Sequence, residues 1–139
     1  MKNHNHKMTK GEIIKFWIES SDKDYESMLN MYKVKEYSYA LFVGHLAIEK
    51  LLKANYVKNN GINIPRIHDL EKLANSAGLK LTEKYANELQ DITKFNIAVR
   101  YDDYKKTFYK KCTKKFTEEN IKSINGLRKW LKKKITEKN

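Results

Sequence analysis

The sequence is poor in the residues that interrupt helices or crosslink chains. Among 139 residues there is one proline, Pro65, and there are five glycines, so helix breakers are too scarce for a loop-rich or β-rich chain. The single cysteine, Cys112, excludes an internal disulfide and suits a reducing compartment, so we expect a cytoplasmic protein. Apolar residues never run for the roughly 20 positions that a membrane-spanning helix needs, so no membrane association of that kind is expected.

Positive charge is abundant but unevenly distributed. The formal net charge is +12, and residues 105–139 supply +10 of it, with 13 Lys and Arg against 3 Asp and Glu. A local basic surface of this kind attracts the phosphates of nucleotides or RNA, or an acidic partner. Lysine is plentiful throughout the chain, so a solvated surface without a ligand is an equal alternative.

Helical spacing of apolar residues extends over most of the chain and predicts an all-α fold. Thr9 and Glu12 form a capping-box pattern at the start of the first helix, and Gly61 suits the end of the second. We expect a flexible tail over residues 1–8 and a single domain over residues 9–136. The expected helices cover residues 9–32, 39–59, 69–77, 82–99 and 117–135, with an irregular, basic segment at residues 101–116.

The segment at residues 39–59 is apolar on most of its sides. Leu41, Ile48 and Leu52 form one stripe, and other apolar side chains lie around it. A helix of this kind is either central in a bundle or covered by a second subunit. We therefore expect a homodimer formed through this helix and its neighbours.

Three segments occur in a specific order: ALFVGHLAIEKLLKA from residue 40, PRIHDLEKL from residue 65 and VRYDD from residue 99. Together they resemble the HEPN domain family, the higher eukaryote and prokaryote nucleotide-binding domain, over roughly residues 14–135. The resemblance implies an up-and-down bundle of four main helices plus a short extra helix, paired as a dimer. Many family members are metal-independent ribonucleases or toxins, and others pair with a small nucleotidyltransferase as a toxin–antitoxin system.

The ribonuclease members of this family use an arginine that is followed, after a gap of four to six residues, by a histidine. Arg100 matches that arginine, but the window for the histidine holds Lys105, Lys106 and Thr107. RNA cleavage through the 2′-hydroxyl needs a group that exchanges protons near neutral pH. A solvated lysine binds a phosphate more readily than it relays a proton. Whether the protein is an enzyme is therefore left uncertain, and a non-catalytic role is favoured.

A polar cluster around Arg100 is the structural alternative to catalysis. Glu49 lies within the apolar second helix, where a carboxylate is costly unless it is paired, so we expect an ion pair with Arg100. Asp24 on the first helix is the other candidate acid. His45 stands one turn before Glu49, either as its hydrogen-bonded core or interface partner or as part of an acid–base pair. The Arg100 guanidinium also suits a phosphate.

The segment after Arg100 mixes lysines with aromatic residues. The side chains that we expect to bind phosphate or nucleic acid, besides Arg100, are Lys105, Lys106, Lys110 and Lys111. The tyrosines that either pack this segment onto the bundle or stack bases are Tyr101, Tyr104 and Tyr109. In some family members paired with a nucleotidyltransferase, a tyrosine near this place is modified with a nucleotide, and Tyr104 is the nearest equivalent.

No metal site and no cofactor are expected. His4 and His6 are two potential ligands in the tail, which is fewer than a metal site needs. His68 and Asp69 are expected to cap or anchor the short third helix. Cys112 lies among lysines that can lower its pKa, but it has no histidine partner in sequence and is taken as incidental.

These observations favour a nucleotide- or nucleic-acid-binding module, or a module that docks a small nucleotidyltransferase of a toxin–antitoxin-like pair. The alternative is a divergent, metal-independent ribonuclease toxin that uses Arg100 with a lysine or His45. A third interpretation is a purely structural dimer whose charge only maintains solubility.

Overall fold

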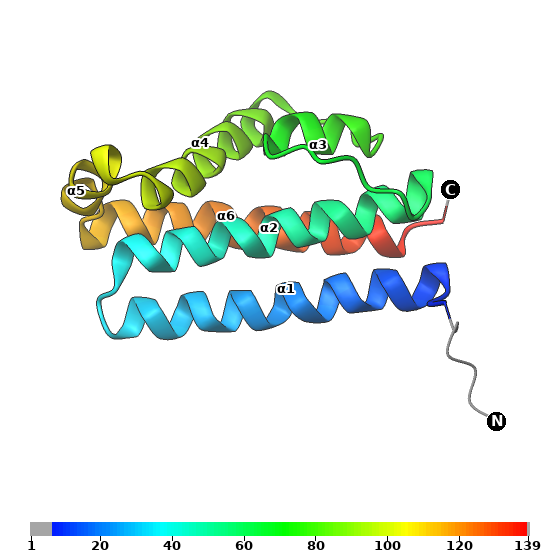
Figure 1. Ribbon diagram of the computed structural model, residues 1–139, viewed down its shortest axis with the longest axis horizontal. Coiled ribbons are helices and arrows are strands. Elements are labelled where there is room, and N and C mark those ends of the chain that lie inside the picture. The colour runs from blue at the N-terminus through cyan, green and yellow to red at the C-terminus, as the bar shows by residue number, and fades with distance from the viewer. Residues whose placement is uncertain (1–6, 139) are drawn as a thin grey trace.

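The protein is described by a computed structural model that covers residues 7–138 and shows helices joined by short connections (Figure 1). Most of the tail expected at residues 1–8 lies outside the described residues. The helices of the described part are α1 (Lys10–Lys33), α2 (Tyr37–Asn60), α3 (Leu70–Ser76), α4 (Glu83–Arg100), α5 (Asp102–Lys111) and α6 (Lys114–Thr136).

The four long helices run alternately up and down and form one bundle. α2 packs against α1, α4 and α6, and α4 crosses the bundle at an angle, as Figure 1 shows. α3 lies beside α4, and α5 covers one end of the bundle. The described chain begins and ends at the other end (Figure 1). The predicted all-α bundle of four main helices is confirmed, with two short helices where one was expected.

Capping side chains determine where most of the helices begin. The Thr9 hydroxyl accepts a hydrogen bond from the Glu12 N–H at 3.1 Å, and the Thr9 N–H donates to Glu12 Oε1 at 2.8 Å, which confirms the predicted capping box. The residues that cap α3, α4 and α6 with a side-chain oxygen are Asp69, Thr82 and Thr113. Four of the six helix starts in the described chain are thus fixed by short polar side chains that stand directly before them, and α2 and α5 begin without such a cap.

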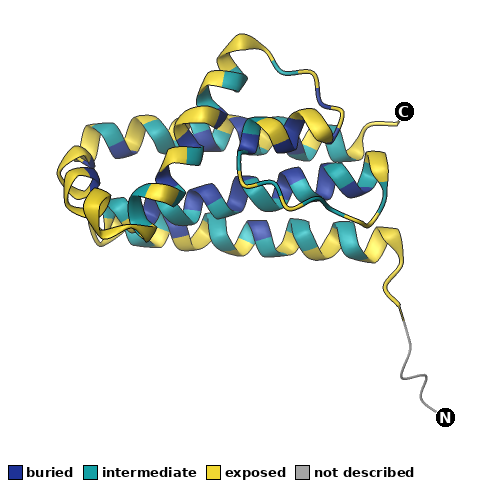
Figure 2. Ribbon diagram, turned by 45° about the horizontal axis from the view of Figure 1, so that its top comes forward, coloured by how far each residue is buried: buried dark blue, intermediate teal, exposed yellow. Residues whose placement is uncertain are grey.

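α2 occupies the centre of the core, where the buried residues in Figure 2 concentrate. Eleven of its 24 residues are buried, and helices pack on it from several sides, mainly α1, α6 and α4 with smaller contributions from α3 and α5. A Cβ atom on Gly44 would lie 2.6 Å from Ile124 Cδ1 and 2.7 Å from Met28 Sδ. α1, α2 and α6 therefore meet so closely here that a larger residue would force the Ile124 and Met28 side chains to shift.

The central position of α2 explains its apolar sides within a single chain. The expected homodimer through α2 thereby loses its main argument, because the bundle itself buries most of these side chains. The homodimer stays a prediction. Neither α2 nor any other helix within residues 7–138 is long and apolar enough to cross a membrane.

The basic segment after α4 differs from the expectation of an irregular chain, because residues 102–111 form α5. Two acids lie in its first turn and two lysines in its last, an order that complements the helix dipole. Its one buried residue, Phe108, packs on Phe95 of α4 with ring centroids 5.5 Å apart. Local charge and a single aromatic contact thus stabilise this helix. The segment is so polar that its apolar pattern did not predict a helix.

α6 begins three residues earlier than expected. Thr117 was the predicted first residue, but it is buried in the first turn and its hydroxyl donates to the Thr113 carbonyl at 2.8 Å. Thr113 performs the capping instead, by accepting from the Phe116 N–H at 3.2 Å. Both threonines are suitable N-cap residues by sequence. The burial of Thr117 in the folded chain shows that Thr113 is the one that caps α6.

Ion pairs join α1 to α6. Asp22 accepts hydrogen bonds from Arg128 at 3.0 Å and from Lys132 at 2.9 Å. Burial opposes the ionisation of Asp22, but these two cations outweigh it and lower the pKa of the carboxyl below its usual value. The Arg128 guanidinium also stacks on the Tyr25 ring at 4.1 Å, so the first and last helices are held by charge as well as by packing.

Candidate functional site

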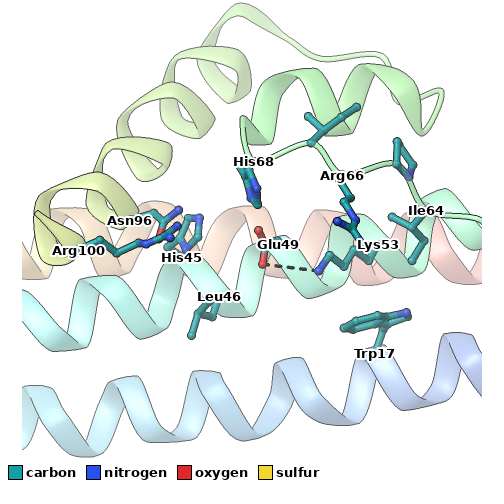
Figure 3. A pocket seen from close by; sticks show the side chains of 12 residues that line it. Trp17, His45, Leu46, Glu49, Lys53, Ile64, Arg66, His68, Asn96 and Arg100 are labelled. Atoms are coloured by element: carbon teal, nitrogen blue, oxygen red, sulfur yellow. Dashed lines mark ion pairs between the residues drawn. The ribbon is translucent and has the colours of Figure 1, made fainter.

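A cavity of about 350 Å³ lies between α2, α4 and the connecting segment 61–69, with Trp17 of α1 at its edge (Figure 3). We call it the α2–α4 cavity. Its charged and polar lining residues are His45, Glu49 and Lys53 on α2, Arg66 and His68 on the connection, and Asn96 and Arg100 on α4.

Residue spacing explains why these side chains converge. The three residues of α2 follow one another at intervals of four and so share one helical face. The two residues of α4 are also one turn apart. Arg66 and His68 are two positions apart in a non-helical segment that Pro65 stiffens, so both project to the same side. On each helix the polar residues of the cavity are one turn apart, and on the extended connection they are two residues apart, so each set faces the cavity.

The charge of the cavity is predominantly positive. Lys53 lies 3.8 Å from Glu49 and 4.8 Å from the centre of the Trp17 ring, so it is held by an ion pair and a cation–π contact. Arg66 and Arg100 are exposed, and neither has an ion pair or a side-chain hydrogen bond within residues 7–138. Three cations thus face one carboxylate, and two of the cations keep their donors available for a ligand.

His45 is the least exposed polar residue of the cavity. Its relative exposure is 1%, and neither ring nitrogen has a hydrogen-bond partner in the described structure. Burial lowers the pKa of His45 to about 4, and the neighbouring His68 and Lys53 act in the same direction. The ring stacks on Phe42 at 6.2 Å. The imidazole is therefore neutral near pH 7, and it carries both an unused donor and an unused acceptor.

The expected ion pair between Arg100 and a core acid is replaced by other pairs. Glu49 lies in the same cavity as Arg100, but its ion pair is with Lys53. Asp24 pairs with Lys50 at 2.7 Å. In both cases the acid finds a lysine of α2, which for Glu49 lies one turn away on its own helix. The structure thus brings Arg100, Glu49 and His45 together and leaves Asp24 outside the cavity.

The cavity includes residues to which sequence analysis gave no ligand role. Asp69 caps α3, with its Oδ1 accepting from the Lys72 N–H at 2.9 Å, so the capping role considered for His68 falls to its neighbour. His68 is instead exposed and lines the cavity together with Arg66. The alternation of Arg66 and His68 after a proline is the one sequence signal that could have indicated that both side chains face the same side. Nothing in the sequence placed them opposite α2.

The four lysines predicted as one binding surface lie apart from the cavity and partly from one another. Lys105 and Lys106 line a separate hollow of about 370 Å³ with Tyr39 and Tyr109, which we call the α5 hollow. Lys111 instead lies over the Phe116 ring at 5.3 Å. The surface predicted around Arg100 is therefore divided: Arg100 lines the α2–α4 cavity, Lys105 and Lys106 line the α5 hollow, and Lys110 and Lys111 line neither.

The three tyrosines of the α5 region are exposed rather than packed on the bundle. The exposed fractions of Tyr101, Tyr104 and Tyr109 are 54%, 57% and 71%. Of the two roles considered for them, packing of the segment belongs to Phe108. The tyrosine rings remain available to stack on bases or on another protein.

Potential metal ligands and the cysteine add no second chemical site. Within residues 7–138 no three His, Cys, Asp or Glu side chains gather as a metal site would require, and His4 and His6 lie outside this range. Cys112 is buried, and burial raises the pKa of its thiol to about 11 despite the opposing charge of Lys111. The thiol is therefore protonated near neutral pH, contrary to the effect considered for the surrounding lysines.

Two solved structures resemble the fold over most of its length. One is TT1696 from Thermus thermophilus, with a TM-score of 0.75 and 16% identity, covering 87% of this chain and 97% of that chain. The other is ST0689, described as an archaeal HEPN homologue, with a TM-score of 0.63 and 23% identity, covering 88% and 98%. A comparison with curated protein sequences found no match.

The sequence itself also matches a known domain. The profile of the HEPN domain aligns with residues 14–135, which extends from the second turn of α1 to the last turn of α6. The bundle and the α2–α4 cavity both lie inside this range. The chain therefore belongs to the HEPN domain family.

Proposed function

We propose that this protein binds nucleotides or nucleic acid through phosphate contacts in the α2–α4 cavity. The observation that carries the proposal is the gathering of three cations around one carboxylate that already has a lysine beside it. Arg100 lies beside His45 and Arg66 beside Lys53, so the two ends of the cavity each offer a guanidinium fork to a phosphate. The neutral His45 and the amide of Asn96 supply further donors.

The α5 hollow supports the same function as a second contact. Lys105, Lys106 and the exposed Tyr109 combine positive charge with a stacking surface, which is the pattern that proteins use to bind single-stranded nucleic acid. A strand whose phosphate occupies the α2–α4 cavity is therefore proposed to continue toward α5.

Binding of a fluorescent single-stranded RNA and of labelled ATP tests the proposal. Arg66→Ala and Arg100→Ala each remove a charged donor, and each is expected to weaken binding roughly tenfold or more. The matched control is Lys94→Ala, which removes one positive charge from an exposed position of α4 outside the cavity. If Lys94→Ala weakens binding as much as Arg100→Ala does, net charge and not the cavity governs binding, and the proposal is wrong.

A divergent ribonuclease is the second candidate, and one observation favours it. His45 and His68 both line the cavity that holds Arg100, although neither follows Arg100 in sequence. Two imidazoles and an arginine are sufficient for acid–base cleavage of RNA. Incubation of a mixed pool of labelled RNAs with the wild type and with folded Arg100→Ala and His68→Gln variants decides between the candidates. If the RNA stays intact in every sample, the interpretation as a binding module stands. If the wild type cleaves RNA and either variant does not, the protein is a ribonuclease.

A protein partner is the third element of the proposal. A small nucleotidyltransferase of a toxin–antitoxin-like pair would dock at the α5 end, where Tyr104 is exposed and open to modification with a nucleotide. A second copy of this chain is proposed as well. Light scattering of the purified protein gives the mass of the assembly, and a monomer at micromolar concentration contradicts the homodimer. Mass spectrometry after co-expression with a neighbouring nucleotidyltransferase gene tests Tyr104, and Tyr104→Phe is its control.

A further inference from the structure

The α2–α4 cavity has an exposed rim and a buried floor. Arg66, His68 and Arg100 are exposed, whereas His45 has a relative exposure of 1%. Figure 3 shows Arg100 and Asn96 beside the His45 ring, and His68 directed toward Glu49. A ligand that uses the floor must therefore send a small polar group past the arginines.

The floor leaves hydrogen-bonding capacity unused. Within residues 7–138 neither nitrogen of His45 has a hydrogen-bond partner, and leaving a buried polar group unsatisfied destabilises the fold. Fold geometry does not require a histidine here, since the inward positions of α2 on either side of it are small or apolar. A ligand oxygen that accepts from His45 would recover this cost, so the arrangement favours a ligand over an empty structural role.

The depth of the cavity discriminates between kinds of phosphate. An internal phosphodiester is bonded to a nucleoside on each side. Both nucleosides are too large for the floor, so the phosphate between them is held at the rim. A terminal phosphate has one ester arm and three unbridged oxygens, and can project inward. It also carries close to two negative charges near neutral pH, which matches the two arginines that have no acidic partner within residues 7–138.

We infer that the α2–α4 cavity is a phosphomonoester site, which takes the terminal phosphate of a nucleotide or of an oligonucleotide end. Arg100 and Asn96, which lie beside His45, clamp two of the oxygens, and His45 donates to the third from the floor. Arg66, beside Lys53, adds positive charge from the other end of the cavity. The inference rests on the proposed function and makes it specific, because it assigns recognition to the end of the chain and not to its backbone.

Protonation of His45 accompanies binding. The charged and titratable groups that face it are Glu49 and Lys53 on α2, Arg66 and His68 on the connection, and Arg100 on α4. Three permanent cations oppose a proton on the ring, and one carboxylate favours it. A phosphate dianion reverses this balance, so the imidazole takes up a proton when the ligand enters.

The test compares end groups on one RNA sequence by fluorescence anisotropy. The probes are a single-stranded decamer with a 5′-phosphate, the same decamer with a 3′-phosphate, and the decamer with hydroxyl ends. An eleven-residue RNA with hydroxyl ends is the matched control, because it adds negative charge as an internal phosphate. Nucleoside monophosphate and nucleoside serve as unlabelled competitors and show whether a free nucleotide suffices.

We expect at least one phosphorylated decamer to bind about tenfold tighter than both hydroxyl-ended RNAs, and the monophosphate to compete where the nucleoside does not. Equal binding of all four RNAs overturns the inference but leaves the proposed function standing. Absence of binding by every RNA and nucleotide overturns both. Stronger binding of the eleven-residue RNA than of the phosphorylated decamers assigns the contact to the backbone and also overturns the inference.

Variants connect the end-group effect to the floor. His45→Gln keeps a donor but cannot titrate, so we expect it to reduce the preference for a terminal phosphate and to abolish the proton uptake. Calorimetry of nucleoside monophosphate binding in two buffers of different ionisation enthalpy measures that uptake. Lys94→Ala should retain both the preference and the uptake. Arg100→Ala, at an exposed position, serves if His45→Gln does not fold, and a preference that survives in it contradicts the clamp.

Discussion

Single buried polar side chains in this protein differ in how far they are satisfied. Ser21 donates to the Ala47 carbonyl at 2.6 Å, and the amide nitrogen of Asn55 donates to the Leu51 carbonyl at 2.9 Å. His45 is as buried as these residues and has no partner at either nitrogen within the described chain. Its burial must therefore be offset by the rest of the core, which makes the stability of the fold sensitive to its protonation.

The pH dependence of stability is a first prediction. The pKa of His45 is about 4 in the folded protein and near 6.5 when the chain is unfolded. Below pH 6.5 the unfolded chain takes up a proton that the fold excludes, so the unfolding free energy falls as pH drops from about 6.5 to 4. The loss from His45 amounts to about 3 kcal/mol. Urea denaturation at several pH values measures it.

The control is His45→Gln, which cannot titrate. Its unfolding free energy should change much less between pH 6.5 and pH 4.5 than that of the wild type. Asp22, whose pKa is lowered, also loses stabilisation on acidification, but only below its ordinary value of 3.8. A wild-type profile that is flat between pH 6.5 and pH 4.5 would show that His45 titrates normally in the fold.

Sequence reasoning at this scale identified side chains better than their partners. Arg100, Glu49 and His45 were predicted to belong together, and they line one cavity. The sequence did not reveal that Glu49 would pair with Lys53 instead of Arg100. Lysines are so common in this chain that the one at position 53 did not stand out as a competitor. Arg66 escaped prediction since its role depends on how a nine-residue connection folds back over α2.

Helices in this bundle meet at close distances, and Gly44 is the clearest case. Gly44→Ala would place a methyl group 2.6 Å from Ile124 Cδ1 and 2.7 Å from Met28 Sδ. Such overpacking costs about 1–3 kcal/mol. Gly126→Ala is the control, since it is also helical, is exposed, and would meet nothing within 4 Å. It should stabilise the protein by about 0.5–1 kcal/mol. Urea denaturation that finds both variants equally stable would contradict this packing.

α5 depends on one anchor and should separate from the bundle when that anchor is removed. Phe108 is its only buried residue and packs on Phe95. We expect Phe108→Ala to increase hydrogen exchange of the α5 amides at least tenfold while the amides of α2 stay protected. Tyr109→Ala, which truncates a 71% exposed ring on the same helix, is the control and should leave exchange nearly unchanged. Loss of protection in α2 as well would show that α5 unfolds only with the whole bundle.

The elements that could be predicted are those with capping residues and an apolar stripe. Thr9, Asp69 and Thr82 marked helix starts that the structure confirms. α5 lacks both signals, because no side chain caps it and only one of its residues is buried. Its helical state results from contact with α4 and from the order of its charges. Neither feature can be detected from the spacing of apolar residues.

At the scale of the whole molecule, charge predicts how binding depends on salt. Affinity for single-stranded RNA should fall as salt rises, with a logarithmic slope of about −0.7 for each phosphate contacted. Replacing the four α5 lysines, Lys105, Lys106, Lys110 and Lys111, by glutamine should flatten that slope. Replacing four exposed lysines of α1 and α4, Lys10, Lys15, Lys84 and Lys94, is the matched control. An equal change in both variants would show that RNA senses net charge and not α5.

The fold as a whole could be predicted because its evidence is distributed over the chain. Three ordered segments resembled the HEPN family, and the profile match over residues 14–135 bears this out. The arrangement of the residues that line the α2–α4 cavity could not be predicted equally well. They come from α2, α4 and a non-helical connection, and their convergence depends on how α4 crosses the bundle.

The two ends of the described chain lie at the same end of the bundle, opposite α5. The two ends could therefore be joined and the chain opened elsewhere without changing how the helices pack. A short linker between the ends, with a new opening at the exposed turn of residues 34–36, would give a circular permutant with the same core. In that permutant the stretch from His45 to Arg100, which supplies the polar lining of the α2–α4 cavity, would remain one uninterrupted segment.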